Sequence, residues 1–410
     1  MSTVSSGTSS ELRRANLRHL LTLIREHGPL SRGELRALGN LSKPTVQAVV
    51  EELLRADLVL DAPGNAGAAR QAGPPPRQIR FNANHSLVVG VDVGAAKMLA
   101  LLSDLDGRVL ATARCSTPQN ASGARLDQTV RTLIDECLDE VGVGRGRLGV
   151  VTVGTTGVVH PSTGAVSVAP QLPGWQGRSV ASVLQDYLGL PVLVENEAHL
   201  AMLGESWRGT AQGVANAAFV QMGVGVGMGI LIDGEIYRGA GGAAGEIGYL
   251  PIGDPTPPGR EGQFEATIGS EALTRHLRPG AHAGAIGDVP RSRTPTARDL
   301  FALAEHDAEA RSAIEAMLAN LARGLVAVSV VLSPELVVLG GGLAASLGPY
   351  VERLEAHLSD RVPVPPTVKR SVLGDSAVAI GAIRRGILSV EQSLFDALAQ
   401  PAPQPQEVSA

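Results

Sequence analysis

Cysteine is nearly missing from this sequence, and its scarcity excludes several classes of protein. Only Cys115 and Cys137 occur in 410 residues, and they lack the spacing of a metal site or a redox pair. Long apolar runs are missing too, because the most apolar stretch, residues 87–102, is interrupted by Asp92 and Lys97. No basic and apolar signal segment begins the chain. We therefore expect a reduced, cytoplasmic protein with no disulfide framework and no membrane partner.

Lysine is also scarce, and the charge is unevenly distributed. Only Lys43, Lys97 and Lys369 are present, so arginine supplies most of the positive charge. Residues 1–81 contain 11 Lys and Arg against 7 Asp and Glu, whereas the remainder contains 24 against 33. The first segment thus carries a charge of +4 and the rest −9. This asymmetry favours a polyanion such as DNA as a partner of the N-terminal segment alone.

The segment 30–55 has the pattern of two short helices joined by a glycine-bearing turn. Ser42 is suited to cap the second helix, and Pro44 is tolerated in its first turn, where backbone N–H groups have no helical acceptor. Apolar side chains at helical spacing would bury one face of that helix, namely Val46, Val49, Val50 and Leu53. Its other face carries short donors and one cation near the N-terminus, as a helix that reads DNA bases requires.

Flanking segments extend this pattern to a winged helix-turn-helix. Apolar residues at 17–24 supply a third helix, and 56–60 and 78–81 resemble two strands that enclose a basic loop. We predict that residues 11–81 bind DNA through Arg32, Ser42, Lys43, Thr45, Gln47, Arg70 and Arg77. A structural or protein-contact role for the same hairpin is the alternative.

The expected DNA target is a double-stranded inverted repeat. One short recognition helix with a small basic face cannot specify a site alone, so two heads are needed. Gln47 is expected to contact a base, and Arg70 is expected to neutralise a phosphate. The sequence predicts a homodimer or a tetramer without distinguishing them.

From Ser86 the chain alternates apolar strands and helical patterns in two successive series. Strand patterns lie at 87–94, 148–153, 191–194 and 336–339, and 217–232 has the pattern of two strands joined by a glycine turn. Helical patterns lie at 126–141 and 308–330. This order predicts an α/β fold with two βββαβα-like halves and a cleft between them.

The predicted domain organisation has five parts. They are a disordered tail at 1–10, the DNA-binding domain at 11–81, a first lobe at 86–208 completed by a helix at about 376–395, a second, dimerising lobe at 209–375, and a disordered proline-rich tail at 396–410.

Five motifs in this order resemble the ROK family of repressors and sugar kinases. They are Asp92-Val93-Gly94, Leu172-Pro173-Gly174-Trp175, Asn196 with a following carboxylate, Ala244-Gly245-Glu246-Ile247-Gly248, and Ser333-Pro334-Glu335 leading into Gly340-Gly341-Gly342. The resemblance implies a two-lobed actin-like, hexokinase-like fold over residues 86–388. Members with an N-terminal winged helix are similar to xylose-type and N-acetylglucosamine-type repressors, which respond to a sugar, a sugar phosphate or a partner protein.

The chain departs from the kinases of this family in both phosphate loops and in the catalytic base. The first loop, residues 94–97, has Ala96 where the kinases carry threonine, and the second, residues 223–229, has Val224 and Met228 in place of threonine and glycine. Apolar side chains there would withhold hydrogen-bond donors from a triphosphate. Glu197 replaces the aspartate base, and one extra methylene displaces the carboxylate by about 1.5 Å.

The family's structural zinc site is also incomplete in this sequence. No cysteine follows Cys137, the family's histidine position is Tyr249, and the cysteine cluster is replaced by residues 259–265. Without thiolates the tetrahedral zinc site has no ligands. We therefore expect neither zinc nor ATP as a cofactor, and no enzymatic activity.

Sugar recognition is better preserved than phosphate transfer. By the family pattern, the sugar contacts correspond to Gln171, Asn196, Glu197, Glu246, Tyr249 and Glu265. Carboxylates and amides that converge on a cleft suit a polyhydroxylated ligand. The alternative is that Glu246 and Glu265 only bond to the backbone and bridge the lobes.

Together these features predict a ROK-type transcription regulator, most simply a repressor, that senses a sugar or sugar derivative in a degenerate kinase-like cleft. One alternative is an active ATP-dependent sugar kinase with altered loops. The other is a DNA-binding repressor whose body serves only for dimerisation and takes no ligand.

Overall fold

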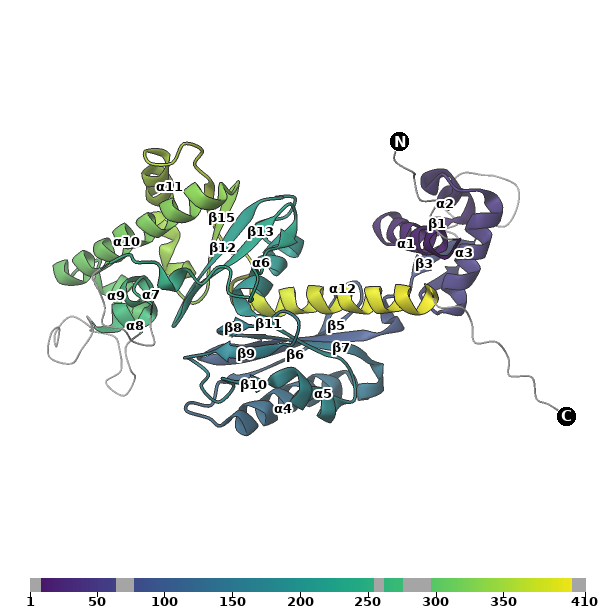
Figure 1. Cartoon of the computed structure of the whole chain (residues 1–410), viewed down its shortest axis with the longest axis horizontal. Helices are drawn as coiled ribbons and strands as arrows, with labels where there is room; N and C mark the ends of the chain where they lie inside the picture. Colours follow the sequence, from purple (N-terminus) through teal and green to yellow (C-terminus); the bar gives the residue numbers. More distant parts are fainter. Residues whose placement is uncertain (1–8, 64–76, 254–261, 276–295, 400–410) are drawn as a thin grey trace. The chain divides into compact units, whose positions relative to one another are not determined.

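The computed structural model describes residues 9–63, 77–253, 262–275 and 296–399, which form two compact units (Figure 1). The smaller unit comprises Met1–Leu87, Ser103–Arg108 and Ile387–Ala410. The larger unit comprises Val88–Leu102 and Val109–Gly386. Each unit has its own hydrophobic core, and they are described separately below.

The smaller unit contains three helices and a small antiparallel sheet, which we call the head. The helices are α1 (Ser9–His27), α2 (Arg32–Gly39) and α3 (Lys43–Arg55), and the sheet has the order β1 (Leu30–Ser31), β3 (Gln78–Phe81), β2 (Val59–Ala62). Ser42 caps α3, as the sequence predicts, because its Oγ accepts the Thr45 N–H at 3.3 Å. Asn40 ends α2 in the left-handed conformation, which asparagine tolerates.

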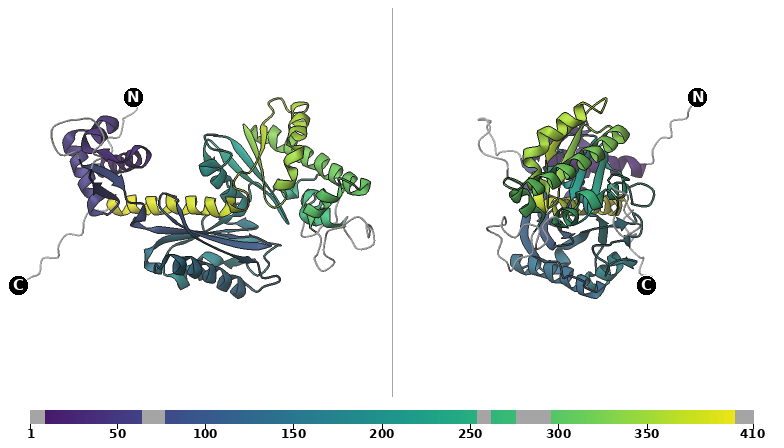
Figure 2. Two further views of the ribbon diagram at one scale, coloured as in Figure 1. Left: turned by 180° about the vertical axis from the view of Figure 1, so that it is seen from behind. Right: turned by 90° about the vertical axis from the view of Figure 1, so that its left-hand side faces the viewer.

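The last turns of the C-terminal helix belong to the head. Helix α12 (Ala377–Ala399) is one unbroken helix, coloured yellow in Figures 1 and 2. Phe395 is buried in the core of the head, and Arg14 and Arg25 form ion pairs with Asp396 and Glu391. The prediction of a tail from residue 396 is therefore wrong for residues 396–399. These residues are helical, because the contacts of Phe395 and Asp396 with the head stabilise the end of α12. Helix α1 likewise begins at Ser9, within the predicted tail at 1–10.

The first half of the larger unit is a five-stranded sheet with helices packed against it. The strand order is β11 (Val192–Asn196), β7 (Leu148–Thr155), β4 (Leu87–Val93), β5 (Lys97–Asp104), β6 (Val109–Ser116). Helices α4 (Gly123–Val141) and α5 (Val180–Leu188) cover one face (Figure 1), and α6 (Glu197–Arg208) follows β11. A small sheet is formed by β10 (Arg178–Ser179), β9 (Ala165–Val168) and β8 (Val158–Val159).

The second half repeats the same strand order. Its sheet runs β14 (Glu235–Ile236), β13 (Val226–Ile232), β12 (Ala217–Met222), β15 (Leu336–Gly340), β16 (Thr367–Arg370). Its helices are α7 (Glu265–Ile268), α8 (Ser270–Thr274), α9 (Ala297–Leu303), α10 (Ala308–Leu332) and α11 (Val351–Ser359). In chain order both sheets read 3-2-1-4-5, which confirms the predicted pair of related α/β halves.

Helix α10 has the length and hydropathy of a membrane span, and half of its most apolar window is buried. Its buried side chains, among them Ile314, Leu318 and Leu321, lie in the core of the second half. The apolar composition of α10 is thus matched by its packing inside the protein, as in a core helix.

Candidate functional site

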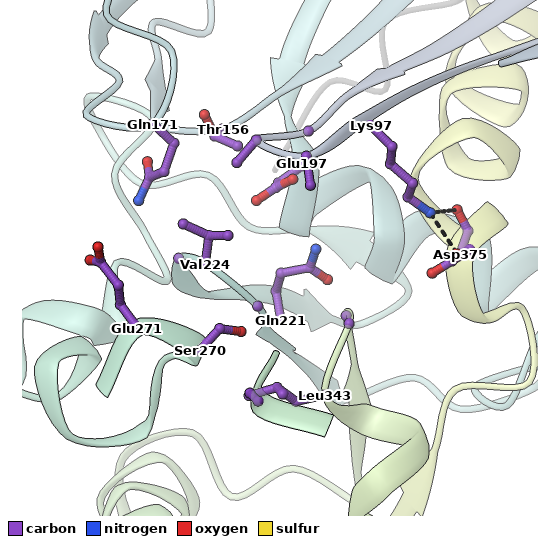
Figure 3. A pocket seen from close by; sticks show the side chains of 18 of the residues that line it. Lys97, Thr156, Gln171, Glu197, Gln221, Val224, Ser270, Glu271, Leu343 and Asp375 are labelled. Carbon is purple, nitrogen blue, oxygen red and sulfur yellow. Dashed lines mark hydrogen bonds and ion pairs between the residues drawn. The ribbon is translucent and has the colours of Figure 1, made fainter. Parts of the chain in front are cut away.

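A cleft of about 1070 Å³ opens within the larger unit, and both sheets contribute to its walls (Figure 3). The first sheet contributes Asp92 and Lys97 from β4 and β5, together with Glu197 at the start of α6. The second contributes the turn 223–225 between β12 and β13, and residues 341–343 after β15. Because these groups lie at strand ends and turns, their positions are fixed by the two sheets.

All six residues predicted to contact a sugar line one smaller cavity that shares part of this cleft. They are Gln171, Asn196, Glu197, Glu246, Tyr249 and Glu265. The structure thus brings together side chains from four separate stretches of the chain. Polar groups that converge in this way are the arrangement expected for a small polyhydroxylated ligand.

Two of these six residues also make bonds that hold the fold. The Asn196 side chain accepts the N–H groups of Ala198 and His199 at 2.8 and 3.2 Å and donates to the Gly157 carbonyl at 2.9 Å, so it caps α6. Glu265 accepts the Val226 N–H at 2.8 Å. Glu265 therefore bonds to the backbone, as the alternative interpretation of this residue predicts, and it also lines the cavity.

The carboxyl groups of the cleft are held in an environment that disfavours their charge. Burial, together with the nearby carboxylates of Asp92 and Glu246, raises the pKa of Glu197 to about 8. Burial raises the pKa of Asp92 to about 7, although the charge of Lys97 opposes this. Burial also raises the pKa of Glu246. Perturbed acids that share one cleft are typical of functional sites.

Two buried polar atoms that line the cleft have no hydrogen-bond partner within the described residues. They are Oδ1 of Asp92 and Oγ1 of Thr156, and both residues line the cleft. A buried polar atom without a partner costs about 1–3 kcal/mol, so such atoms call for an explanation. A bound ligand that donates to Asp92 and bonds to Thr156 would supply the missing partners.

The first glycine loop carries an ion pair in place of a phosphate-binding hydroxyl. Gly94 N–H donates to the Lys97 carbonyl at 3.0 Å and closes a tight turn. The Lys97 ammonium lies 3.0 Å from Oδ2 of Asp375, and Figure 3 shows this pair at the edge of the cleft. Ala96 also lines the cleft. The only cation of this loop is thus already neutralised by a carboxylate.

The second glycine loop differs from the sequence prediction in one respect. Val224 faces Gln171 and Glu197 across the cleft, and its side chain is 45% exposed (Figure 3). Met228 does not face the cleft, because its position on β13 directs it into the core of the second half. Of the three apolar replacements predicted in the phosphate loops, Ala96 and Val224 line the cleft and Met228 does not.

No group of three or more His, Cys, Asp or Glu side chains with the geometry of a metal site occurs in the part of the chain that the structure describes. Residues 259–261, which belong to the segment that corresponds to the family's cysteine cluster, lie outside that part.

Those residues predicted to contact DNA that the structure describes lie on the head, where several are paired within the protein. Lys43 and Gln47 are exposed on α3, and the Gln47 amide donates to Glu51 at 2.6 Å. Thr45 shares a hydrogen bond with the Ser42 hydroxyl at 2.7 Å. Arg70 lies outside the described residues.

Asp61 on β2 neutralises two of the predicted DNA contacts. Arg77 donates to its carboxylate at 2.8 Å, and Arg32 lies 3.7 Å from it. These pairs could not be predicted from the sequence, because the paired residues are 16 and 29 positions apart. Contact with DNA by Arg32 or Arg77 would require the phosphates to compete with Asp61.

The fold and cleft define a class, that of the two-lobed sugar kinases and the regulators related to them. The chain belongs to the ROK family, whose sequence pattern matches residues 88–384.

A crystal structure of a ROK family transcriptional regulator, a homolog of the E. coli MLC protein, matches 95% of this chain and 98% of that chain, with a TM-score of 0.74 and 21% identity. A putative xylose repressor of Caldicellulosiruptor sp. (strain Rt8B.4) is 25% identical over 92% of this chain and 96% of its own length. A glucokinase of Halalkalibacterium halodurans is 29% identical over 72% of this chain and 92% of its own length.

Proposed function

We propose that the protein is a DNA-binding transcription regulator, most simply a repressor, whose kinase-like cleft senses a sugar or sugar derivative. The observation that carries this proposal is the head. The repressor relative aligns with 92% of the chain, whereas the glucokinase aligns with 72%, close to the extent of the kinase-like part alone. We further propose that the head is a winged helix-turn-helix and that the protein acts in the cytoplasm as a dimer or tetramer.

The cleft supports sensing in preference to phosphate transfer. Efficient transfer requires donors on the phosphate loops and a correctly placed base. Here the loops present Ala96 and Val224, Lys97 is paired with Asp375, and the base position carries Glu197. The six residues around the smaller cavity need no such donors to bind sugar hydroxyls.

We expect the purified protein to transfer no phosphate from ATP to glucose, xylose or N-acetylglucosamine, and to contain no stoichiometric zinc. Glu197→Asp alone should not create activity, because Ala96 and Val224 still withhold hydroxyls. A coupled ATPase assay and elemental analysis test both points. Turnover within the ordinary enzyme range of roughly 1–1,000 per second, or one zinc per chain, would favour the kinase alternative.

We expect different residues of the head to recognise bases and to bind phosphates. Gln47→Ala should relax base preference at one position in each half-site by about 1–3 kcal/mol, because its amide can pair with a base edge. Lys43→Met should weaken binding to all sequences and reduce the salt slope by about one. Mobility shifts with altered operators at several salt concentrations provide the measurement. Identical behaviour of the two variants would contradict the proposed orientation of α3.

A thermal-shift screen distinguishes sensing from a ligand-free dimerisation platform. A ligand that binds only the folded state stabilises it by RT ln(1 + [L]/Kd). Xylose, glucose, N-acetylglucosamine and their phosphates form the panel, because the repressor relative is named for xylose. If none of a broad panel of sugars raises the melting temperature, the platform alternative gains support.

A further inference from the structure

The walls of the cleft and of the smaller cavity are acidic. Six carboxyl groups of the described residues line them, namely Asp92, Glu197, Glu246, Glu265, Glu271 and Asp375. Only two cationic side chains of the described residues, Lys97 and Arg298, line the same walls. Phosphate sites in proteins have the opposite character, because they bring together cations and N–H donors.

Both cations already have partners inside the protein. The Lys97 ammonium lies 3.0 Å from Oδ2 of Asp375 and donates to the carbonyl oxygen of the same residue at 3.2 Å (Figure 3). Arg298 donates to the Gly342 carbonyl oxygen through Nε and Nη2, at 3.3 and 3.2 Å. A phosphate would therefore compete with a carboxylate at Lys97 and with a backbone carbonyl at Arg298.

Repulsion between carboxyl groups of the cleft is visible in the pKa of Glu197. Burial raises this pKa to about 8, and the charges of Asp92 and Glu246 contribute to the increase, although the charge of Lys97 opposes it. A phosphate dianion placed beside these groups would add to the repulsion, where little water is present to screen it. A neutral hydroxyl adds no charge and avoids this cost.

Two buried residues of the cleft require a ligand that donates hydrogen bonds. Asp92 is 4% exposed and Thr156 is 6% exposed, and Oδ1 of Asp92 and Oγ1 of Thr156 have no partner within the described residues. An ionised carboxylate only accepts hydrogen bonds. A sugar hydroxyl can donate to Asp92, whereas the oxygens of a phosphate dianion are acceptors alone. The unpartnered carboxylate oxygen thus favours a hydroxyl over a phosphate.

The smaller cavity and the cleft form one continuous space for a ligand. The cavity has a volume of about 50 Å³ and the cleft about 1070 Å³, whereas ligand pockets usually measure about 300–1,000 Å³. Thr156, Gln171 and Glu197 line both, and Figure 3 shows these three side chains along one side of the cleft. A sugar that contacts Glu246 in the cavity therefore extends past Thr156 into the cleft that Asp92 lines.

We propose that this site selects an unphosphorylated sugar and excludes its phosphate esters, with Asp92 and Thr156 as further ligand contacts. The proposal rests on the proposed sugar-sensing function and narrows its ligand class. Asp92 accepts a hydrogen bond from one sugar hydroxyl, and Thr156 bonds to a hydroxyl between the cavity and the cleft. Because carboxyl groups line both spaces, the exclusion does not depend on which carbon of the sugar carries the phosphate.

Isothermal titration calorimetry of the full-length protein tests the selectivity. The probes are glucose and N-acetylglucosamine with their 6-phosphates, and xylose with its 1-phosphate, at pH 8 and low salt. Burial raises the pKa of Asp92 to about 7, so this carboxyl is mainly ionised at pH 8. The sugar that binds should bind about tenfold or more tightly than its ester. An ester that binds as tightly as its parent sugar would overturn the proposal.

Two variants separate the charge of Asp92 from the hydrogen bond of Thr156. Asp92→Asn removes a charged acceptor, so the sugar should bind about tenfold more weakly and the difference between sugar and ester should decrease. Thr156→Val removes a hydroxyl and no charge, so it should weaken sugar and ester alike. Asp139→Asn, at an exposed position on α4, is the matched control. Wild-type affinities in both Asp92→Asn and Thr156→Val would overturn the two assigned contacts.

The same titrations distinguish failure of this proposal from failure of the proposed function. If an ester binds and its parent sugar does not, the protein still senses a sugar derivative, and only the exclusion of phosphate is wrong. If neither the sugars nor the esters bind, the result contradicts both the sensing function and the selectivity derived from it.

Discussion

Replacing Glu246 with glutamine should give a protein that folds and binds its operator but no longer responds to its sugar. Glu246 lies in the cavity with Glu197 and Glu265, and its carboxylate can accept two sugar hydroxyls where an amide accepts fewer. A ligand changes DNA affinity only by binding one dimer geometry more tightly than another. A typical coupling of about 1–3 kcal/mol corresponds to a response of roughly 5- to 150-fold, and the variant should lose most of it.

The measurement is operator affinity of wild type and variant with and without the sugar that the thermal-shift screen identifies. Glu235→Gln, at an exposed glutamate on β14, is the matched control and should respond like wild type. If the sugar is an inducer, the variant represses constitutively. A full response in Glu246→Gln would show that Glu246 is a structural remnant and that the sugar site has been misplaced.

Asp92→Asn should stabilise the protein at pH 8 by about 2–4 kcal/mol and much less at pH 5. Burial raises the pKa of Asp92 from 3.8 to about 7, and each pH unit of displacement corresponds to about 1.4 kcal/mol. Well below pH 4 the carboxyl is protonated in both the folded and unfolded states, so its ionisation does not reduce stability. As pH rises to about 7 the unfolded chain ionises first, so stability is lost through this window. An amide cannot ionise and avoids the loss.

Chemical denaturation at pH 5, 6.5 and 8 measures this difference, with Asp139→Asn on the exposed side of α4 as the control. A variant that is less stable than wild type at pH 8 would show that the attraction between Asp92 and Lys97 outweighs the cost of burial. The expected gain implies that Asp92 is retained at the expense of stability, as functional residues often are.

The local features of this protein could be predicted from the sequence, whereas its long-range pairs could not. The cap of α3 by Ser42 and the two related series of strands could be predicted, because capping and hairpin signals depend on neighbouring residues. The six cavity residues were placed by motifs whose order reflects the family fold. Lys97 and Asp375 are 278 residues apart, and no local pattern relates them.

Two kinds of error have clear physical origins. Met228 was assigned to the phosphate loop, but side chains alternate along β13, and its position points into the core. The contacts of His199 could not be predicted, because a lone histidine in a helix has no signature and its ring lies near Glu195 and the distant Ala244 only in the folded chain.

The end of helix α12 belongs to the head, although it lies far from the rest of the head in the sequence. Phe395 completes a core whose other buried residues lie more than 300 positions earlier, between Leu17 and Ile79. Asp396 and Glu391 pair with the first helix of the head. A head excised at residue 87 would expose the apolar surface that Phe395 covers. Chimeric regulators that exchange heads between relatives would therefore need to transfer the final turns of the C-terminal helix together with the N-terminal segment.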